Sequence, residues 1–379
     1  QLSGRSGSVG VVADFSTFDI QGYRNQSAAR RHQLNTVMTL DSSPDTRHKL
    51  IVNLFEMPMA QDPLGLTATG LSTPWAAGTN ALTANTRKMV HQEQLGWVMS
   101  HRLDGDLKLQ TRFYRGDRSN QQYLSSQSWV GLERQFWGWG GQLQGQRDGS
   151  VPVQWTLGLE GDQSGEQRQG GLAPMGLKAG LPNRNEWNQA NTVDAFAQAN
   201  WLLSEQFTLV TGARRSSVVL RSNDQCLSNP PCTYADDGSG RARYQATNPV
   251  LGLTWHVSPM WNVYANTGRG FETPTLAEAA YITSGSSVLG RFNTGLLAAT
   301  SKHREVGLKF ANGVGSRASL AWFDIETQNE IVVDKVVSGQ TSYTNATQTS
   351  RQGLEFNAQQ SLGLHWRAEA SLTAMRASY

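Results

Sequence analysis

The side chains of this chain that could catalyse a reaction or hold a metal are scattered rather than grouped. The 7 histidines occur singly, and His91-Gln92-Glu93-Gln94 lacks the second histidine of the HExxH zinc motif. The sequence contains no serine–histidine–aspartate grouping and no glycine-rich phosphate loop between a strand and a helix. The run from Asp236 to Gly240 offers clustered oxygens to a cation such as Ca²⁺, but without EF-hand spacing it is interpreted as a polar loop. The sequence therefore predicts no enzyme, no metal site and no covalently bound cofactor.

The two cysteines, Cys226 and Cys232, flank a short segment that contains two adjacent prolines. Because prolines favour turns, this spacing predicts a small loop disulfide and an oxidising compartment. Two reduced thiols in a surface loop are the alternative. The formal net charge of +3 is too small to indicate a nucleic-acid partner.

The strands that must position these residues are visible as an alternation of apolar and polar side chains. In 107–113, leucine, threonine and phenylalanine alternate with lysine, glutamine and arginine, and 151–162 and 366–374 repeat the pattern. The alternation predicts an all-β fold of about fifteen strands. We expect helix only in short loop pieces such as Thr275–Ala280. No apolar run approaches the roughly 18 residues that a membrane helix needs.

The connections between the predicted strands alternate between short and long. Short turns such as Asp104-Gly105 and Asn312-Gly313 are separated by longer segments. An antiparallel up-and-down sheet places its short turns at one rim and its long loops at the other, as transmembrane β-barrels do. We therefore expect residues 1–379 to be a single domain, part of such a barrel. The expected extracellular loops lie near 19–31, 59–88, 118–130, 164–189, 222–242, 271–299 and 329–342.

The composition agrees with a barrel that has a lipid-facing outside and a wet interior. The mean hydropathy is -0.46, yet the chain contains 12 tryptophans. Only the outward face of a barrel must be apolar, so half of each strand can be polar. Tryptophans close to the short turns are predicted to form a ring at the membrane boundary, with burial in a core as the alternative. They are Trp155, Trp201, Trp255, Trp261 and Trp366.

Several segments, in order along the chain, resemble motifs of the TonB-dependent outer-membrane receptors. The most specific is Ala265–Glu278, ANTGRGFETPTLAE. The others are 22–29, 62–67, 85–88, 329–334 and 341–355. The resemblance implies a 22-stranded barrel plugged by an N-terminal domain. On that basis the chain is a fragment that corresponds to strands three to seventeen, a partial barrel without the plug, the energy-coupling box and the last strands.

The resemblance also implies a function. It predicts a receptor in the outer membrane of a Gram-negative bacterium, in contact with outer-membrane lipids. The receptor would import a scarce, bulky small molecule, driven by the TonB–ExbB–ExbD complex through the plug. A ferric siderophore or another iron complex is the leading ligand, and pyrroloquinoline quinone is the alternative because segments of its receptor's branch are similar. A passive general porin is the second alternative; a barrel enzyme would need a catalytic cluster, and a soluble propeller would need a four-strand repeat.

The 265–278 motif suggests specific roles at the rim. Gly268 and Gly270 are expected to let the strand bend, and Pro274 to end the ladder of hydrogen bonds. Arg269 and Glu272 are predicted to lie at the mouth or inner wall, in a rim ion pair that holds the barrel against the plug or in contact with an anionic ligand. Four further arginines are predicted to face the interior and to favour anionic cargo: Arg112, Arg115, Arg214 and Arg221.

Overall fold

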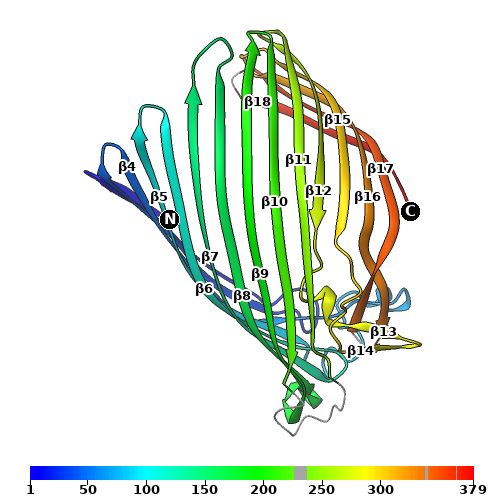
Figure 1. Ribbon diagram of the computed structural model, residues 1–379. Coiled ribbons are helices and arrows are strands. Elements are labelled where there is room, and N and C mark those ends of the chain that lie inside the picture. The colour runs from blue at the N-terminus through cyan, green and yellow to red at the C-terminus, as the bar shows by residue number, and fades with distance from the viewer. Residues whose placement is uncertain (226–236, 338–339, 364) are drawn as a thin grey trace.

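The structure, a computed structural model, describes residues 1–225, 237–337, 340–363 and 365–379. It is dominated by one curved antiparallel sheet of 16 strands that pair in chain order (Figure 1). The sheet contains β1 (Leu2–Ser6), β2 (Val9–Ile20), β3 (Ala29–Ser43), β4 (Thr46–Gln61), β5 (Arg87–Asp104), β6 (Leu107–Tyr123), β7 (Ser128–Arg147), β8 (Val153–Leu172), β9 (Ala179–Ser204), β10 (Phe207–Asp224), β11 (Gly240–Ser258), β12 (Trp261–Glu272), β15 (Ala299–Ala311), β16 (Ser316–Val337), β17 (Gln340–Leu362) and β18 (Trp366–Ser378). The predicted all-β, up-and-down antiparallel fold is confirmed.

A second sheet, made of β13 (Ile282–Ser284) and β14 (Ser287–Leu289), is a small hairpin in the connection between β12 and β15. The only helices in the described ranges are three short 3₁₀ turns, η1 (Thr69–Ser72), η2 (Pro174–Gly176) and η3 (Glu278–Ala280). None of them is long and apolar enough to cross a membrane. Within the described residues β1 pairs only with β2, and β18 only with β17, so this part of the sheet is open.

The tight turns and the longest connections lie at opposite ends of the sheet, as predicted, although the β6–β7 connection at the long-loop end comprises only residues 124–127. The tight turns lie at the top of Figure 1, and the connections after β2, β4, β10 and β12 lie at the bottom. Three predicted loops are wrong in extent, because 118–130, 164–189 and 329–342 are largely strand: β6 runs to Tyr123, β8 to Leu172 and β16 to Val337. In these parts alternation is no longer visible although backbone pairing persists. The strand ends at 118–123 and 164–171 are polar on both faces, whereas 331–333 are apolar on both.

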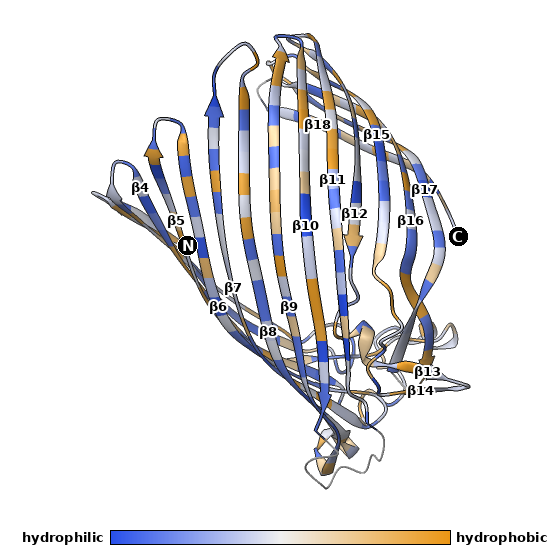
Figure 2. Cartoon of the chain, in the orientation of Figure 1, coloured by the Kyte–Doolittle hydropathy of each residue, from blue (hydrophilic) through white to orange (hydrophobic). Residues whose placement is uncertain are grey.

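The two faces of the sheet differ in polarity along every long strand. On β8, Trp155, Leu157 and Leu159 point to one face, while Glu160 and Asp162 point to the other. Figure 2 shows the resulting stripes of apolar and polar residues on neighbouring strands. The polar face is the concave one, because its side chains reach across two strands to meet, as Arg214 of β10 and Arg112 of β6 both do at Glu160. The convex face is therefore the apolar, outward face.

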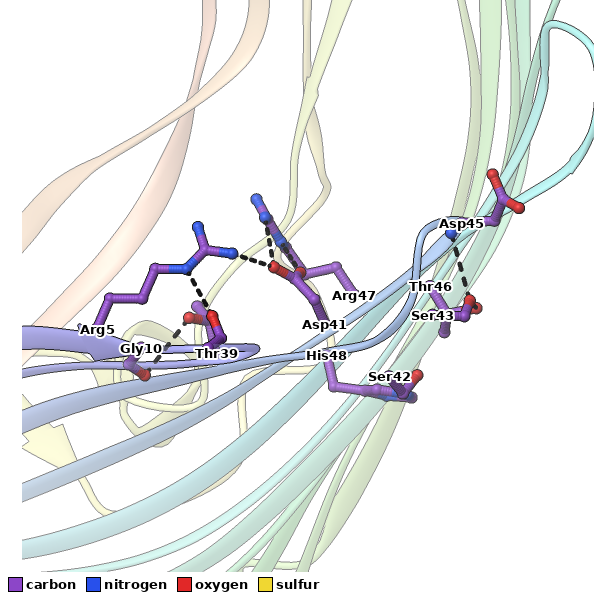
Figure 3. Close-up of polar contacts among 11 residues, drawn as sticks. Arg5, Gly10, Thr39, Asp41, Ser42, Ser43, Asp45, Thr46, Arg47 and His48 are labelled. Carbon is purple, nitrogen blue, oxygen red and sulfur yellow. Dashed lines mark hydrogen bonds and ion pairs between the residues drawn. The ribbon is translucent and has the colours of Figure 1, made fainter.

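At the tight-turn end an arginine–aspartate cluster joins the first strands of the sheet (Figure 3). Asp41 of β3 accepts hydrogen bonds from Arg5 of β1 at 2.8 Å and from Arg47 of β4 at 2.5 Å. Arg5 also donates to the carbonyl oxygen of Gly7 in the β1–β2 turn, at 3.2 Å. These contacts hold three strands in register at the rim.

Candidate ligand site at the long-loop end

The connection between β12 and β15 folds back over the concave side of the sheet at the long-loop end. Its Ala279 and Phe292 are buried against Leu220 of β10 and against Ala242 and Tyr244 of β11. The Tyr244 hydroxyl donates to the carbonyl oxygen of Leu296 at 3.0 Å, which fixes the end of the connection to the wall.

The same connection reaches strands on both sides of the mouth. Arg184 of β9 donates to the carbonyl oxygen of Ala280 at 2.9 Å. On the other side, Lys335 of β16 donates to the carbonyl oxygen of Gly285 at 2.6 Å. Because it is anchored to β9 and to β16, this segment spans the interior as a partial floor.

A cavity of about 570 Å³ lies between this segment and the wall. Its lining comes from β6 to β9, from the segment itself and from the first residues of β17, including Asn120, Trp129, Arg168, Tyr281 and Tyr343. Strands distant in sequence therefore meet at one place, and the volume is in the range of small-molecule sites.

Two arginines and a tyrosine form the polar centre of this cavity. The guanidinium carbons of Arg184 and Arg168 lie 4.5 Å and 5.3 Å from the centroid of the Tyr281 ring. Arg168 also donates from Nη2 to the Tyr281 hydroxyl at 3.0 Å. Cations beside a tyrosine ring are held in place by the ring's negative face, so both guanidinium groups are fixed before any ligand arrives.

The ion pairs around the cavity leave Arg168 with free donors. Arg184 pairs with Glu186 at 2.6 Å, and Glu166 is held by Arg134 at 2.5 Å. None of the ion pairs of the described residues involves Arg168, and its Nε is shielded from solvent without a hydrogen-bond partner. A buried guanidinium donor without an acceptor is unfavourable. An anionic ligand in the cavity would meet a guanidinium group whose charge no carboxylate of the described residues pairs with directly.

Arg168 lies nine positions beyond Leu159, the last large apolar residue on the outward side of β8, and so well outside the apolar band. Burial, followed by the positive charge of Arg184, lowers the pKa of Arg168 from its ordinary value. An approaching anion would act in the opposite direction on this pKa, because it stabilises the charged guanidinium.

A wider hollow of about 700 Å³ follows the inner wall between β12 and β18 near the tight turns. It is lined by single residues of neighbouring strands, such as Asn262, Arg317 and Asn357, and no folded-in segment covers it. It is therefore a stretch of the open interior, while the cavity around Arg168 is enclosed by elements from both sides.

Closer to the tight turns, a network of ion pairs on the concave wall joins residues of four strands. Arg214 of β10 pairs with Glu160 of β8 and, at 2.5 Å, with Asp194 of β9. Arg112 of β6 pairs with the same Glu160 at 2.5 Å. Arg112 and Arg214 thus lie on the inward face, but their charges are matched by carboxylates of the wall.

Arg115 and Arg221 do not face the interior, so that part of the prediction is wrong. Arg115 stands in register between Leu95 and Trp137 on the outward face of β6, three residues from the inward Arg112. On β10, Arg221 lies an odd number of residues after Arg214, and the strand has no bulge between the two. The Arg221 side chain is exposed. Because strand side chains alternate, residues at odd separations point to opposite faces.

Arg269 and Glu272 also lie on opposite faces of β12. Arg269 shares its face with Trp261 and Ala265, and Glu272 shares the other. The outward Arg269 does not lie on the inner wall, so that part of the prediction is wrong, and the two side chains make no ion pair with each other among the described residues. A contact of Glu272 with a plug stays a prediction. The predicted bend is wrong as well, because neither glycine of the motif has a positive φ. A Cβ at Gly270 would instead clash with Oγ of Ser301 and lie 3.1 Å from Nε2 of His303, so the side chains of β15 pack closely over this glycine.

All five predicted boundary tryptophans lie on the outward face near the tight turns. Their register partners include Leu209 for Trp201, Phe207 for Trp255 and Phe310 for Trp261. A second outward aromatic row, Trp97, Phe113 and Trp139 in direct register, lies at the other side of the apolar band. These three aromatic residues lie far from the short turns, so the pattern of tryptophans near turns did not predict them.

Cys226, Cys232 and Asp236 lie outside the described residues, so the disulfide remains a prediction. In the described part of the loop, the Asp237 carboxylate accepts the Ser239 amide at 2.8 Å, and hydrogen bonding to Ser239 lowers the pKa of Asp237. The described residues contain no group of three or more histidine, cysteine, aspartate or glutamate side chains able to hold a metal ion.

A glycine of the concave wall, Gly138, leaves room for a polar contact between the strands on either side of it. The Tyr114 hydroxyl of β6 donates to Asp162 of β8 across Gly138 of β7. A Cβ at Gly138 would lie 2.5 Å from the tyrosine hydroxyl, whereas nothing lies within 4 Å of one at Gly141. We expect Gly138→Ala to lower the free energy of unfolding by about 1–3 kcal/mol, and the outward Gly141→Ala to change it little. Urea unfolding of the full-length protein in lipid vesicles would measure both, and equal effects would contradict this packing.

Arg168, Arg184 and Tyr281 were not among the predicted site residues. Their separation along the chain, 16 and 97 residues, hides their proximity. The sequence offered one indication: Arg168 lies an even number of residues from Glu160 and Asp162 on β8, so all three side chains point inward. Tyr281 gave no such signal, because it belongs to an irregular connection.

Comparison with known proteins agrees with this architecture. Residues 13–379 match the family model described as TonB dependent receptor-like, beta-barrel. A curated relative, the iron-regulated outer membrane virulence protein of Vibrio cholerae serotype O1, is 28% identical over 140 residues, which cover 36% of this chain and 18% of that protein.

Among solved structures, the ferric citrate transporter FecA in its unliganded form superposes with a TM-score of 0.77 at 15% identity, over 99% of this chain and 56% of that one. The ferric yersiniabactin uptake receptor FyuA from Yersinia pestis gives a TM-score of 0.74 at 13% identity, over 99% and 58%. At these identities the likeness shows the fold alone. The chain spans about half the length of these structures.

Proposed function

The chain belongs to the TonB-dependent receptor family, and from this membership we propose that it is part of a receptor that imports an anionic, metal-carrying ligand across the outer membrane. In this proposal the long-loop end is extracellular, and the cavity around Arg168 receives the ligand from outside. The observation that carries the proposal is Arg168, a residue that lines a small-molecule-sized cavity and makes no ion pair among the described residues.

The chemistry of the cavity supports a bulky anion with aromatic or planar parts. Fixed guanidinium groups bind carboxylate or catecholate oxygens, and the aromatic rings of Trp129 and Tyr281 offer flat contact surfaces. The relatives' names concern iron regulation, ferric citrate and ferric yersiniabactin. A ferric siderophore or another iron complex is therefore the ligand we propose.

Pyrroloquinoline quinone is the alternative ligand, because it is also planar and anionic. In this proposal energy for import comes from TonB–ExbB–ExbD acting through a plug domain; the family's name supports the dependence on TonB. The inward Glu160–Arg214 network would then face that plug rather than the ligand, since its charges are already matched. A passive porin, the remaining alternative, would need neither the partial floor nor TonB.

Growth of a receptor-deletion strain separates these ligands. Under iron starvation with a panel of ferric siderophores, we expect the deletion to stop growth on at least one of them, and the full-length gene to restore it. Restoration should fail in a strain that lacks TonB, which is the control for energy coupling. Growth that depends on the receptor only when pyrroloquinoline quinone must be supplied would shift the ligand to that quinone. Restoration without TonB would instead support a passive pore and contradict the proposal.

A further inference from the structure

The charged side chains that line the cavity around Arg168 balance one another. In the described lining they are two arginines, Arg168 and Arg184, and two carboxylates, Glu186 and Asp224. The remaining described residues of the lining are uncharged. The cavity therefore offers an anion a local contact with a guanidinium group without an overall positive charge.

The two arginines differ in what they can offer to a ligand. Arg184 donates from Nε to Glu186 at 2.6 Å and from Nη2 to the carbonyl oxygen of Ala280 at 2.9 Å. Its charge is therefore matched, and its donors hold the wall and the β12–β15 connection together. Arg168 makes no ion pair among the described residues, and it donates to the hydroxyl group of Tyr281. An acidic group of a ligand would therefore pair with Arg168 rather than with Arg184.

Both carboxylates of the lining are held at the wall. The Glu186 side chain is 5% exposed and is paired with Arg184. Oδ2 of Asp224 accepts a hydrogen bond from the backbone amide of Gly238, in the β10–β11 connection, at 3.0 Å. Charge-assisted hydrogen bonds of this kind fix a carboxylate in place. Negative charges on a ligand would therefore lie close to two fixed negative charges of the protein, and like charges brought together weaken binding.

We propose that Glu186 and Asp224 are specificity-determining residues, which restrict the ligand to ferric complexes with a single free acidic group and little net charge. This inference rests on the proposed import of an iron complex and narrows the class of complex. The free acidic group binds Arg168, and the two carboxylates disfavour any complex with a large excess of negative charge.

The chemistry of the iron-binding groups decides which complexes meet this condition. Three hydroxamate groups carry one negative charge each and balance the charge of iron(III), so a ferric trihydroxamate with one added carboxylate has a single net negative charge. Three catecholate groups carry two each and leave an excess of three. Hydroxamates also resemble amides, and the lining offers the amide side chains of Gln122, Asn183 and Gln340 as donors and acceptors. A ferric trihydroxamate that carries one carboxylate is therefore the class of ligand that fits.

Binding of three iron(III) complexes to the full-length receptor in detergent tests this charge selection. The complexes of N-succinyl- and N-acetyl-desferrioxamine B share one trihydroxamate scaffold, but only the first carries a carboxylate. A tripodal tricatecholate is the trianionic probe. Quenching of tryptophan fluorescence should show that the carboxylated complex binds about ten-fold more tightly than the neutral one, because it gains a charge-assisted hydrogen bond. The tricatecholate should bind about ten-fold more weakly than the carboxylated complex, because its charge meets the two carboxylates.

Removal of a carboxylate of the lining should relax this selection. Glu186→Gln keeps the size of the side chain and removes its charge, so the affinity should rise about three-fold for each negative charge of the ligand. The expected gain is about three-fold for the carboxylated complex and about 30-fold for the tricatecholate, with no gain for the neutral complex. A merely structural role of Glu186 would change all three affinities alike. Asp224→Asn should produce the same ranking, and it replaces Glu186→Gln if the unpaired Arg184 prevents folding.

Glu355→Gln is the matched control, because it removes the same charge far from the cavity. Glu355 is exposed on β17, in cross-strand register with Tyr264 of the concave face. It lies twelve residues from Tyr343 of the lining, about 40 Å along the strand. The control should leave all three affinities unchanged. Failure of the carboxylated trihydroxamate to bind, tightest binding of the tricatecholate by the wild type, or gains that do not depend on ligand charge would overturn the inference.

A separate outcome would contradict the proposed function itself. Growth on any ferric complex that requires both the receptor and TonB would support import even where the charge selection is wrong. Absence of such growth on every ferric complex tested would contradict the import of iron, whatever the three complexes show in detergent.

Discussion

Replacement of Arg168 by alanine is expected to weaken binding of the transported ligand about 30- to 100-fold in the full-length receptor. The change removes a charge-assisted hydrogen bond in a shielded cavity, an interaction of about 2–3 kcal/mol. Arg184 remains beside Tyr281 but is already paired with Glu186, so it does not replace the lost donors. Titration of intrinsic tryptophan fluorescence with the ferric complex that supports growth would measure the change.

Two further variants show whether the effect belongs to the cavity. Arg168→Lys keeps the charge but loses the planar fork, so affinity should fall between that of the wild type and that of the alanine variant. Arg221→Ala removes the same charge at the same end of the sheet, but from the outward face of β10, and should leave affinity unchanged. If Arg168→Ala and Arg221→Ala had equal effects, general attraction of anions rather than this cavity would explain ligand binding.

Replacement of Arg214 by alanine is expected to destabilise the barrel wall by about 2–4 kcal/mol. The side chain of Asp194 is only 6% exposed and would lose its cation, and its Oδ1 already has no hydrogen-bond partner. Glu160, which is 14% exposed, would keep Arg112. The unpaired carboxylate of Asp194 is therefore the main source of the loss.

Urea unfolding in neutral lipid vesicles would measure this change. The adjacent Arg215→Ala is the matched control, because Arg215 is exposed on the other face and its hydrogen-bond partners are neutral. It should change stability by no more than about 0.5 kcal/mol. Adding Asp194→Asn to Arg214→Ala should recover part of the loss, since the second substitution removes the uncompensated charge. A stable Arg214→Ala protein would show that water in the interior solvates these carboxylates well enough.

The architecture could be predicted because it follows from two local signals, alternation and turn length. Both are properties of consecutive residues, and both persist wherever one face of a strand meets hydrocarbon. Beyond the apolar band the alternation is lost, because 118–123 are polar on both faces of the strand and 331–333 are apolar on both. The backbone nevertheless remains paired in both places. Strand extent there depends on partners in neighbouring strands, which a single sequence does not reveal.

The site could be predicted only in part. Parity along β6 already separates Arg112 from Arg115, so the error at Arg115 was avoidable from the sequence. The cavity was not predictable in this way, because Arg168 and Tyr281 meet only when the β12–β15 connection folds over the wall. Long-range contacts of irregular segments leave no periodic signal.

We expect one face of this sheet to meet lipid and the other to line a wet passage. Spin labels at single cysteines on β8 test it most directly in the full-length protein in lipid nanodiscs. Labels at Leu157 and Leu159, which are 50% and 55% exposed on the outward face, should collide with dissolved oxygen and be shielded from a water-soluble nickel chelate. Labels at Gln154 and Thr156 should show the reverse. Collision rates that fail to alternate along 154–159, or that show all four positions open to the nickel chelate, would contradict a sheet with one face in lipid and the other in water.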